Sequence, residues 1–332
     1  MTSRYHVQLP QLNERLYREP LAALQGADLQ KKCERLLSFQ PQAAVNRALQ
    51  SQARAISDGN PRLLEWLDLI LQDKQTDAAL ILERMEEQAI QFRESILAQE
   101  LLNQQDEALR MMLARGLVFE LPVPLPPMAA TWTAIPNRQQ QRERAIALGL
   151  LESIAASQEP LCRVPRLLSP LLPLVEDDTL PATATAALYG QWWGEGKNTT
   201  EEQALELYRL AKLSQNLIVL YEVGRVLAEQ WRKQGRYREA GMLWEELVEI
   251  GKGWWGEEHP AVASSLNNLA VLYKSQGRYE EAEPLYLQAL QLRQRLLGQD
   301  HPDVASSLSN LAVLYQHQGR YEEAEPLPNL AV

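Results

Sequence analysis

The stretch that decides the fold is Ala261-Val-Ala-Ser-Ser-Leu-Asn-Asn-Leu-Ala-Val-Leu-Tyr273, and it returns 42 residues later as Asp303-Val-Ala-Ser-Ser-Leu-Ser-Asn-Leu-Ala-Val-Leu-Tyr315. A second segment, Gln276-Gly-Arg-Tyr-Glu-Glu-Ala-Glu-Pro-Leu285, returns at the same interval as Gln318-Gly-Arg-Tyr-Glu-Glu-Ala-Glu-Pro-Leu327. A third Gln-Gly-Arg-Tyr occupies residues 234–237, again 42 residues earlier. Self-similarity at a fixed period of this length indicates a stacked array of repeats.

Each repeat is predicted to be a pair of helices. Leu266, Leu269 and Tyr273 recur at spacings of three and four residues, which places them on one face of a helix. Gly277 is predicted to end this helix, because glycine readily adopts the left-handed conformation found past helix ends. The second helix carries its own apolar stripe at Ala282, Tyr286 and Ala289. Such a hairpin cannot bury its apolar faces alone, so neighbouring hairpins must stack.

Two histidines occupy the same point of successive repeats. His259 and His301 stand directly before Pro260 and Pro302, and proline suits the first position of a helix because no amide donor is needed there. Recurrence at a structural position predicts a turn or cap role for both histidines rather than metal ligation. The glutamate pair at 280–281 opens the second helix, where negative charge is favoured, so we do not expect an acid/base pair.

These residues resemble the tetratricopeptide repeat, and the Asn-Leu-Ala-Val-Leu-Tyr string at its 42-residue interval resembles the kinesin-light-chain type. The resemblance implies an all-α fold, a superhelix of helical hairpins over residues 181–332 whose last repeat is truncated. Trp231 and Trp244 are expected in the core, where later repeats carry tyrosine. Fainter copies of the pattern precede the strong ones and include Ala204, Tyr208, Ala211, Leu227, Ala228 and Ala240.

The same resemblance implies a binding face, since the first helices of tetratricopeptide arrays line a concave groove. The side chains expected in this peptide-binding groove are Ser264, Asn267, Asn268, Val271, Lys274, Ser306, Asn310 and Val313. Asn268 and Asn310 are expected to hold an extended peptide, because an amide offers its backbone both a donor and an acceptor. The alternative is that these residues face only solvent or an adjacent repeat. Lys274 is the one basic residue of the set, which does not favour a carboxylate clamp.

The amino-terminal part, residues 1–130, resembles the helical lid and winged helix of STAND-class signalling ATPases, the group related to NB-ARC proteins. Gly59-Asn-Pro-Arg-Leu-Leu-Glu65 resembles the Gly-x-Pro motif of the lid, and Leu113-Ala-Arg-Gly-Leu-Val-Phe-Glu-Leu-Pro122 resembles part of the winged helix. The resemblance implies that Pro61 would contact the adenine of a nucleotide held by a separate domain. An ordinary helix start would carry the same Gly-x-Pro.

Coarse periodicity divides this part into helices. Residues 1–50 are predicted to be mostly helical, and Pro61 is predicted to open a helix whose buried face carries Leu63, Leu64, Leu67 and Leu71. A long polar helix is predicted over 76–103 and another over 106–115. Residues 117–124 are predicted to be extended.

The phosphate-binding loop of that ATPase class is missing from this sequence. The nearest match to Gly-x-x-x-x-Gly-Lys-Ser/Thr is Gly190-Gln-Trp-Trp-Gly-Glu-Gly-Lys-Asn198. It has one residue too many between the outer glycines, and Asn198 stands where a magnesium-binding hydroxyl is needed. We interpret it as a loop between two repeat helices, so the chain resembles the carboxy-terminal half of such an ATPase without its P-loop.

A proline-broken helical connector, residues 131–180, is predicted between the two parts. Its clearest element is a helix over 142–157 with Ala145, Leu148, Leu151 and Ile154 on one face.

Composition limits the function classes. The 332 residues carry a net charge of −10, which disfavours a nucleic-acid partner because phosphate binding needs a basic surface. Two cysteines far apart, Cys33 and Cys162, fit a reducing compartment and give no metal spacing. No apolar run is long enough to span a membrane or serve as a signal peptide. A cytoplasmic location, no membrane contact, no cofactor and no metal are expected.

No catalytic constellation is visible, so the chain is not expected to be an enzyme. The function that fits best is an interaction scaffold that binds a peptide or protein segment in the repeat groove. The alternative is the regulatory or sensor half of a split or truncated STAND-class ATPase. A partner carrying a phosphate-binding loop would discriminate between the two.

The carboxyl end is expected to fray or self-associate. After Leu327 the copy breaks, because Pro328 stands where the preceding repeat has Tyr286, and no polar capping helix follows. Hydrogen exchange followed by mass spectrometry should therefore show fast amide exchange across 322–332. A monomer with full protection of these amides would contradict this expectation.

Overall fold

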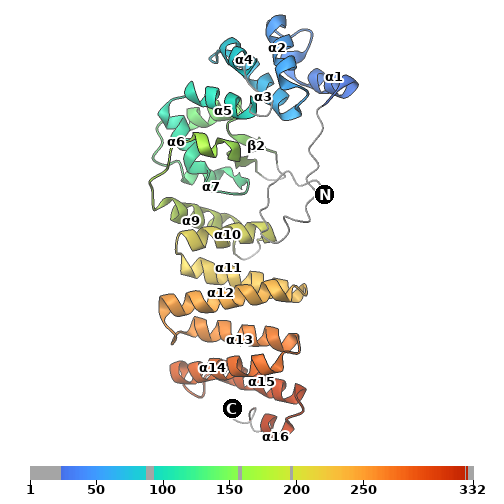
Figure 1. The fold of residues 1–332 in the computed structure, drawn as a ribbon. Coiled ribbons are helices and arrows are strands. Elements are labelled where there is room, and N and C mark those ends of the chain that lie inside the picture. The colour runs from blue at the N-terminus through green and yellow to red at the C-terminus, as the bar shows by residue number, and fades with distance from the viewer. Residues whose placement is uncertain (1–23, 87–92, 156–158, 195–196, 326, 328–332) are drawn as a thin grey trace. The chain divides into compact units, whose positions relative to one another are not determined.

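The computed structural model describes residues 24–86, 93–155, 159–194, 197–325 and 327. The chain forms two units (Figure 1). The first takes the described residues up to Leu117 together with Trp132–Val175, and the second takes Val118–Thr131 and the chain from Glu176 onward. The expected three-part division at 130 and 180 stays a prediction.

The first unit is a set of short helices with one β-hairpin. Its strands β2, Glu152–Ile154, and β3, Leu161–Arg163, pair antiparallel, with Ser153 opposite Cys162. The helices are α1 (Gly26–Arg35), η1 (Leu37–Phe39), α2 (Arg47–Ser57), α3 (Pro61–Gln72), α4 (Ala78–Glu86), α5 (Arg93–Asn103), α6 (Glu107–Gly116), α8 (Arg138–Ala147) and η3 (Arg166–Leu171).

The predicted start of α3 is confirmed. Gly59 takes the left-handed conformation with φ +74°, Pro61 is the first helical residue, and the Asn60 side chain accepts from the amides of the first turn. Leu63, Leu64 and Leu67 are buried as predicted, whereas Leu71 is half-buried, and Trp66 and Ile70 complete the buried face. The helix predicted over 106–115 is confirmed as α6. Of the helical segment expected over 1–50, residues 1–23 lie outside the described residues.

The prediction of one long helix over 76–103 is wrong. Arg84 in α4 donates to Glu100 in α5 at 2.5 Å. One straight helix would separate these residues by about 24 Å, at 1.5 Å per residue. The segment is therefore a helical hairpin, whose residues 87–92 lie outside the described part.

Two further predictions fail near the hairpin. The helix expected over 142–157 ends at Ala147, because Gly149 turns the chain with φ +69° and β2 follows. A Cβ at Gly149 would lie only 2.9 Å from the Trp66 ring, whose Nε1 donates to the Leu148 carbonyl at 2.7 Å. The extended segment expected over 117–124 is a strand only at β1, Val123–Pro124.

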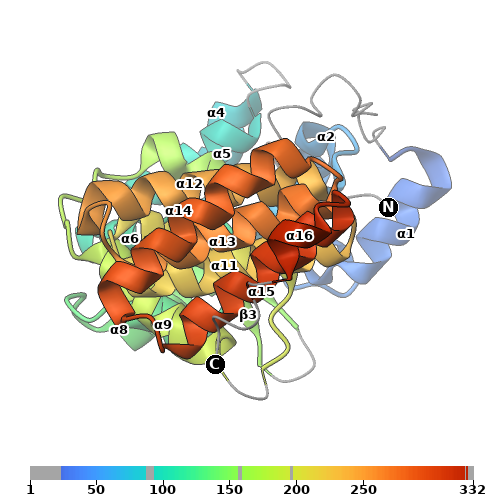
Figure 2. The same cartoon turned by 90° about the horizontal axis from the view of Figure 1, so that it is seen from below.

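The second unit is a stack of helices in chain order, and the expected all-α repeat fold is confirmed. Each helix from α9 onward packs against the next, and helices of successive repeats overlie one another when viewed along the stack (Figures 1 and 2). Its helices are α7 (Leu125–Ala130), α9 (Leu180–Trp192), α10 (Glu201–Leu213), α11 (Leu217–Lys233), α12 (Tyr237–Trp255), α13 (Pro260–Ser275), α14 (Tyr279–Leu297), α15 (Pro302–His317) and α16 (Tyr321–Ala324). The glycine-rich match to a phosphate loop begins inside α9 and continues toward α10.

The Gln-Gly-Arg-Tyr turn closes the last three hairpins by the same backbone geometry. Gly277 has φ +74°, its amide donates to the Lys274 carbonyl at 3.0 Å, and the Arg278 amide donates to the Tyr273 carbonyl at 2.9 Å. This pair of bonds is the Schellman motif. The same bonds recur at Gly235 and at Gly319, so the predicted helix ends are confirmed.

Cap and core residues also lie as predicted. His259 Nδ1 accepts from the Ala261 amide, and His301 Nδ1 accepts from the Asp303 amide, both at 3.1 Å. Trp231 and Trp244 are buried. One continuous core joins α13 to α16 and includes Ala270, Ala282, Tyr286, Leu308, Leu311, Tyr315 and Ala324. The break expected after Leu327 falls on residues outside the described part.

One core position differs between repeats. Arg293 in α14 is buried and donates to the Ser307 hydroxyl at 2.8 Å. The residue 42 positions earlier is Gly251, where α12 leaves space for the Tyr221 side chain. The Tyr221 hydroxyl donates to the Leu247 carbonyl, and burial raises the pKa of Tyr221 to about 12. Glycine is needed at 251 because a Cβ there would overlap that hydroxyl.

We expect Gly251→Ala to lower the free energy of unfolding by about 1–3 kcal/mol, the usual cost of overpacking a core. Gly253→Ala is the matched control in the same helix, since a Cβ at 253 meets nothing within 4 Å. This control should be neutral or stabilise by up to about 1 kcal/mol, because alanine favours helices over glycine. Urea unfolding followed by circular dichroism measures both, and equal effects of the two changes would contradict the packing account.

Candidate functional site

The first helices of the repeats carry the predicted binding residues. Asn267 is buried with 7% of its surface exposed, and Val313 is 37% exposed. The rest of the predicted set keeps access to solvent: Ser264, Asn268, Val271, Lys274 and Asn310 are half-buried, and Ser306 is exposed. Seven of the eight predicted side chains can therefore be reached from solvent without a change of fold.

Two of the predicted amides come together across neighbouring repeats. Asn310 Nδ2 in α15 donates to Asn267 Oδ1 in α13 at 3.1 Å. The bond fixes the orientation of both side chains and leaves Asn310 Oδ1 and Asn267 Nδ2 with hydrogen-bonding capacity. Asn310 thus faces an adjacent repeat, as the alternative interpretation of the sequence expected. Its Oδ1 can still accept a hydrogen bond from a ligand. The Asn268 side chain, by contrast, makes no hydrogen bond to another described residue.

Two serines of α15 are already engaged. The Ser306 hydroxyl donates to the Pro302 carbonyl at 2.9 Å, and the Ser309 hydroxyl donates to the Ala305 carbonyl at the same distance. These bonds stay within one helix and use the hydroxyl protons. The serines can therefore accept hydrogen bonds from a ligand more readily than they can donate them.

Sequence analysis missed a second cation on this face. Burial lowers the pKa of Lys274, and the positive charge of Arg232 in α11 lowers it further. Arg232 stands 42 residues before Lys274, so the repeat alignment held the signal. Arg232 is bound to Glu229 through two hydrogen bonds, at 2.8 and 2.6 Å. Within the described part of the chain, Lys274 has no carboxylate partner within 4 Å.

At the ends of α13 and α15, arginine side chains stack on tyrosine rings. Arg278 lies 4.0 Å from the centre of the Tyr273 ring, and Arg320 lies 4.1 Å from that of Tyr315. The Tyr273 hydroxyl donates to Glu245 of the preceding repeat at 2.7 Å. Burial, together with the nearby Glu245 carboxylate, raises the pKa of Tyr273 to about 12. Each of these two tyrosines is thus held between an arginine of its own turn and a glutamate of the preceding repeat.

Acidic charge is concentrated on the second helices. α12 carries Glu239, Glu245, Glu246 and Glu249, whereas α13 carries no acidic residue and α15 carries only Asp303, in its first turn. The first-helix face over α13 and α15 is therefore close to neutral although the chain is acidic. A neutral face lined by amides and valines suits a ligand recognised through its backbone.

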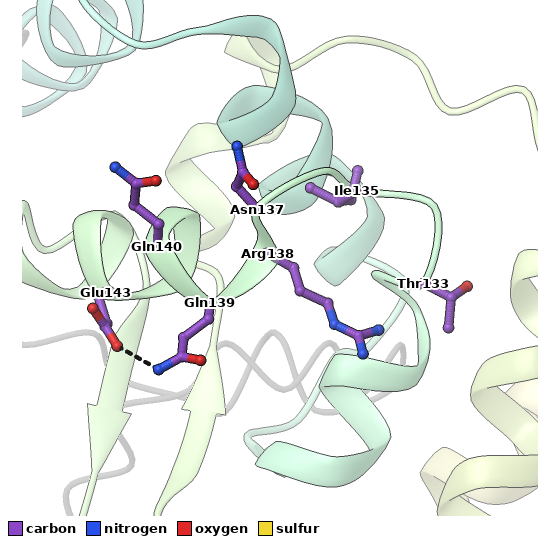
Figure 3. Close-up of a pocket in the computed structure, with 7 residues that line it drawn as sticks. All are labelled: Thr133, Ile135, Asn137, Arg138, Gln139, Gln140 and Glu143. Carbon is purple, nitrogen blue, oxygen red and sulfur yellow. Dashed lines mark hydrogen bonds between the residues drawn. The ribbon is translucent and has the colours of Figure 1, made fainter.

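A polar hollow lies in the first unit (Figure 3). It measures about 670 Å³ and is bordered by Asn137, whose φ is +49°, and by the start of α8. Gln139 Nε2 donates to Glu143 there at 3.1 Å. The remaining lining residues are Thr133, Ile135, Arg138 and Gln140. This lining contains no histidine or cysteine, and its groups do not form a nucleophile and base pair.

Within the described residues, no group of three or more His, Cys, Asp and Glu side chains is arranged to hold a metal ion. In the same part of the chain, no helix is long and apolar enough to cross a membrane.

Comparison with known proteins identifies the repeats. The family model of the tetratricopeptide repeat matches residues 262–303 and 304–327. These residues therefore form tetratricopeptide repeats. A search of curated proteins finds no match.

Comparison with solved structures finds matches of low sequence identity. BtubC (BKLC) from P. vanneervenii is 23% identical, with 62% of this chain and 70% of that chain covered and a TM-score of 0.36. A putative kinesin light chain with nearly identical TPR-like repeats from Podosopora anserina is 22% identical, with 46% and 83% covered and a TM-score of 0.31. A STAND protein with a tetratricopeptide repeat sensor from Pyrococcus horikoshii is 12% identical, with 93% and 60% covered and a TM-score of 0.36.

We expect Asn267→Leu to lower the free energy of unfolding by roughly 0.5–1.5 kcal/mol, because it removes the bond from Asn310 that joins two repeats. Asn268→Leu is the matched control, since it makes the same exchange at the next residue, where no such bond is present. Urea unfolding of both variants measures the difference. If both cost the same, the bond between repeats does not stabilise the stack.

Proposed function

We propose that this chain is a non-catalytic interaction scaffold, and that the first-helix face of α13 and α15 captures an extended segment of a partner protein. The observation that carries the proposal is the pair formed by Asn267 and Asn310. The buried Asn267 holds the half-buried Asn310 in place, so the Asn310 Oδ1 acceptor stands ready in a fixed position. Pre-ordered groups bind more tightly because less conformational entropy is lost on binding.

The surroundings of this pair favour a peptide over other ligands. Val271 and Val313 provide apolar positions beside the amides, and a main chain in extended form presents its own amide groups to both sides. The near-neutral charge of the face makes a nucleic acid a poor ligand. A cytoplasmic location belongs to the same proposal, since the two cysteines are free thiols.

The test uses peptides selected on the protein itself. Random twelve-residue peptides displayed on phage are selected against the whole chain, and the Kd of each selected peptide is measured by fluorescence anisotropy. Asn268→Ala with Asn310→Ala should weaken the peptides at least tenfold, a loss of about 1.4 kcal/mol, while helicity by circular dichroism is unchanged. Ser309→Ala is the control, because that hydroxyl is engaged within its own helix.

Peptides that bind the double variant as tightly as the original chain would exclude this face as the binding site. A library that yields no binder to the original chain, screened beside a tetratricopeptide protein of known ligand as positive control, would count against the scaffold proposal itself.

A second proposal rests on the start of α3. In this proposal residues 1–130 are the lid and winged-helix part of a STAND-class ATPase, and they dock on a separately encoded nucleotide domain. Pro61 stands at the first position of α3 and is half-buried, beside the left-handed Gly59 and the cap at Asn60. Such a rigid helix start, with part of its proline ring accessible, is the feature that supports contact with a nucleotide base.

The discriminating experiment is purification of the tagged chain from its native cells, followed by mass spectrometry. A stoichiometric partner with a phosphate-binding loop, whose ATP affinity falls with Pro61→Ala, would support the split ATPase. A partner without such a loop, or one unaffected by Pro61→Ala, would exclude it.

A further inference from the structure

One lysine on the first-helix face lacks an anionic partner. Lys274 is the only lysine or arginine in α13 and α15, and it is half-buried near the end of α13. Among the described residues, no carboxylate lies within 4 Å of its ammonium group. The charged group that acts on Lys274 is a second cation, Arg232 in α11. A half-buried ammonium group that meets like charge is costly unless an anion comes to it.

The preceding repeat shows how the fold itself can neutralise a cation at this position. Arg232 stands 42 residues before Lys274 and is bound by Glu229, one helical turn earlier, through hydrogen bonds of 2.8 and 2.6 Å. The residue that corresponds to Glu229 in the next repeat is Val271. Lys274 therefore lacks the carboxylate that its counterpart has, and its charge is available to an anion from a ligand.

Lys274 lies on the same side of α13 as the pair of amides. Asn267, Val271 and Lys274 follow one another at intervals of four and three residues, which places them on one stripe of the helix. Asn310 of the next repeat donates to the first of these, Asn267, at 3.1 Å. Seven residues of helix span about 10 Å, and an extended chain covers that distance in about three residues. One short segment can therefore contact both Asn310 and Lys274.

The surroundings of Lys274 favour a carboxylate as its ligand. Burial lowers the pKa of Lys274 because it removes water from the charged form, and the charge of Arg232 lowers this pKa further. A carboxylate beside the ammonium group offsets both effects, since it supplies opposite charge and accepts a strong hydrogen bond. Because Glu229 neutralises Arg232, these three residues leave one net positive charge. One positive charge suits a single acidic side chain.

We propose that Lys274 binds an acidic side chain of the segment captured by the first-helix face, so that the ligand is an extended segment that carries an aspartate or a glutamate. The inference rests on the proposed capture of a segment by this face. It adds a chemical requirement, because the Asn310 acceptor alone would bind the main chain of any sequence. Asn310 holds the backbone of the segment, and Lys274 selects among sequences by charge.

The experiment uses the peptides selected on phage against the whole chain. Each is synthesised with an amidated carboxyl end, so that its only carboxylates are side chains, and again with each acidic residue changed singly to its amide. Lys274→Met should raise the Kd of the selected peptides at least threefold, and the change of one acidic residue should raise the Kd for the original chain by a similar factor. The two changes together should cost no more than either alone, because both remove the same contact.

Two further variants separate charge from packing. Lys274→Arg keeps the positive charge and should retain most of the affinity. Lys252→Met is the matched control, since Lys252 is half-buried as well, but it lies in α12 and pairs with Glu249 at 3.1 Å. This control removes the same charge from the chain and should leave the Kd of every peptide unchanged. Circular dichroism and Tm of each variant verify that the fold is kept.

The outcomes distinguish this inference from the scaffold proposal on which it rests. Peptides that need Asn268 and Asn310 but bind Lys274→Met as tightly as the original chain overturn the role of Lys274 alone. The same holds if the acid-to-amide change costs as much in Lys274→Met as in the original chain, because the acidic residue then binds elsewhere. Peptides insensitive to the two asparagines, or a library without a binder, overturn both proposals.

Discussion

The stacking of the repeats depends on the Gln-Gly-Arg-Tyr turn, because these residues end one helix, begin the next and bind the preceding repeat. At residues 318–321 the glycine, with φ +75°, lets the chain reverse. Arg320 then lies over the Tyr315 ring and donates to Glu283 of the preceding second helix at 2.7 Å. The same residues thus close a hairpin and bind it to the preceding repeat. Because the two sets of contacts share residues, the stability of a repeat depends on its neighbours.

Residues that occur in near-identical copies could be placed from sequence, as could the unique helices α3 and α6, whose ends carry local capping signals. Segments whose conformation depends on tertiary contacts could not. The helix ends at Gly277 and Gly319 and the caps at His259 and His301 follow from local chemistry that repeats. The β-hairpin was missed because its strands are three residues long, and the apolar spacing before it fits a helix equally well. Only Gly149 could have marked the break, and its close approach to Trp66, 83 residues earlier, is a tertiary contact.

The contacts within the predicted binding face also could not be derived from sequence alone. Sequence alignment places Asn268 and Asn310 at one repeat position, yet the structure bonds Asn310 to Asn267, one residue off that register. Which side chains meet across two repeats depends on the rotation of one first helix relative to the next. An alignment of equivalent positions does not give that rotation. Arg232 was missed for a related reason: it is equivalent to Lys274 in the repeat, but the effect of its charge on Lys274 is a tertiary interaction that the alignment does not contain.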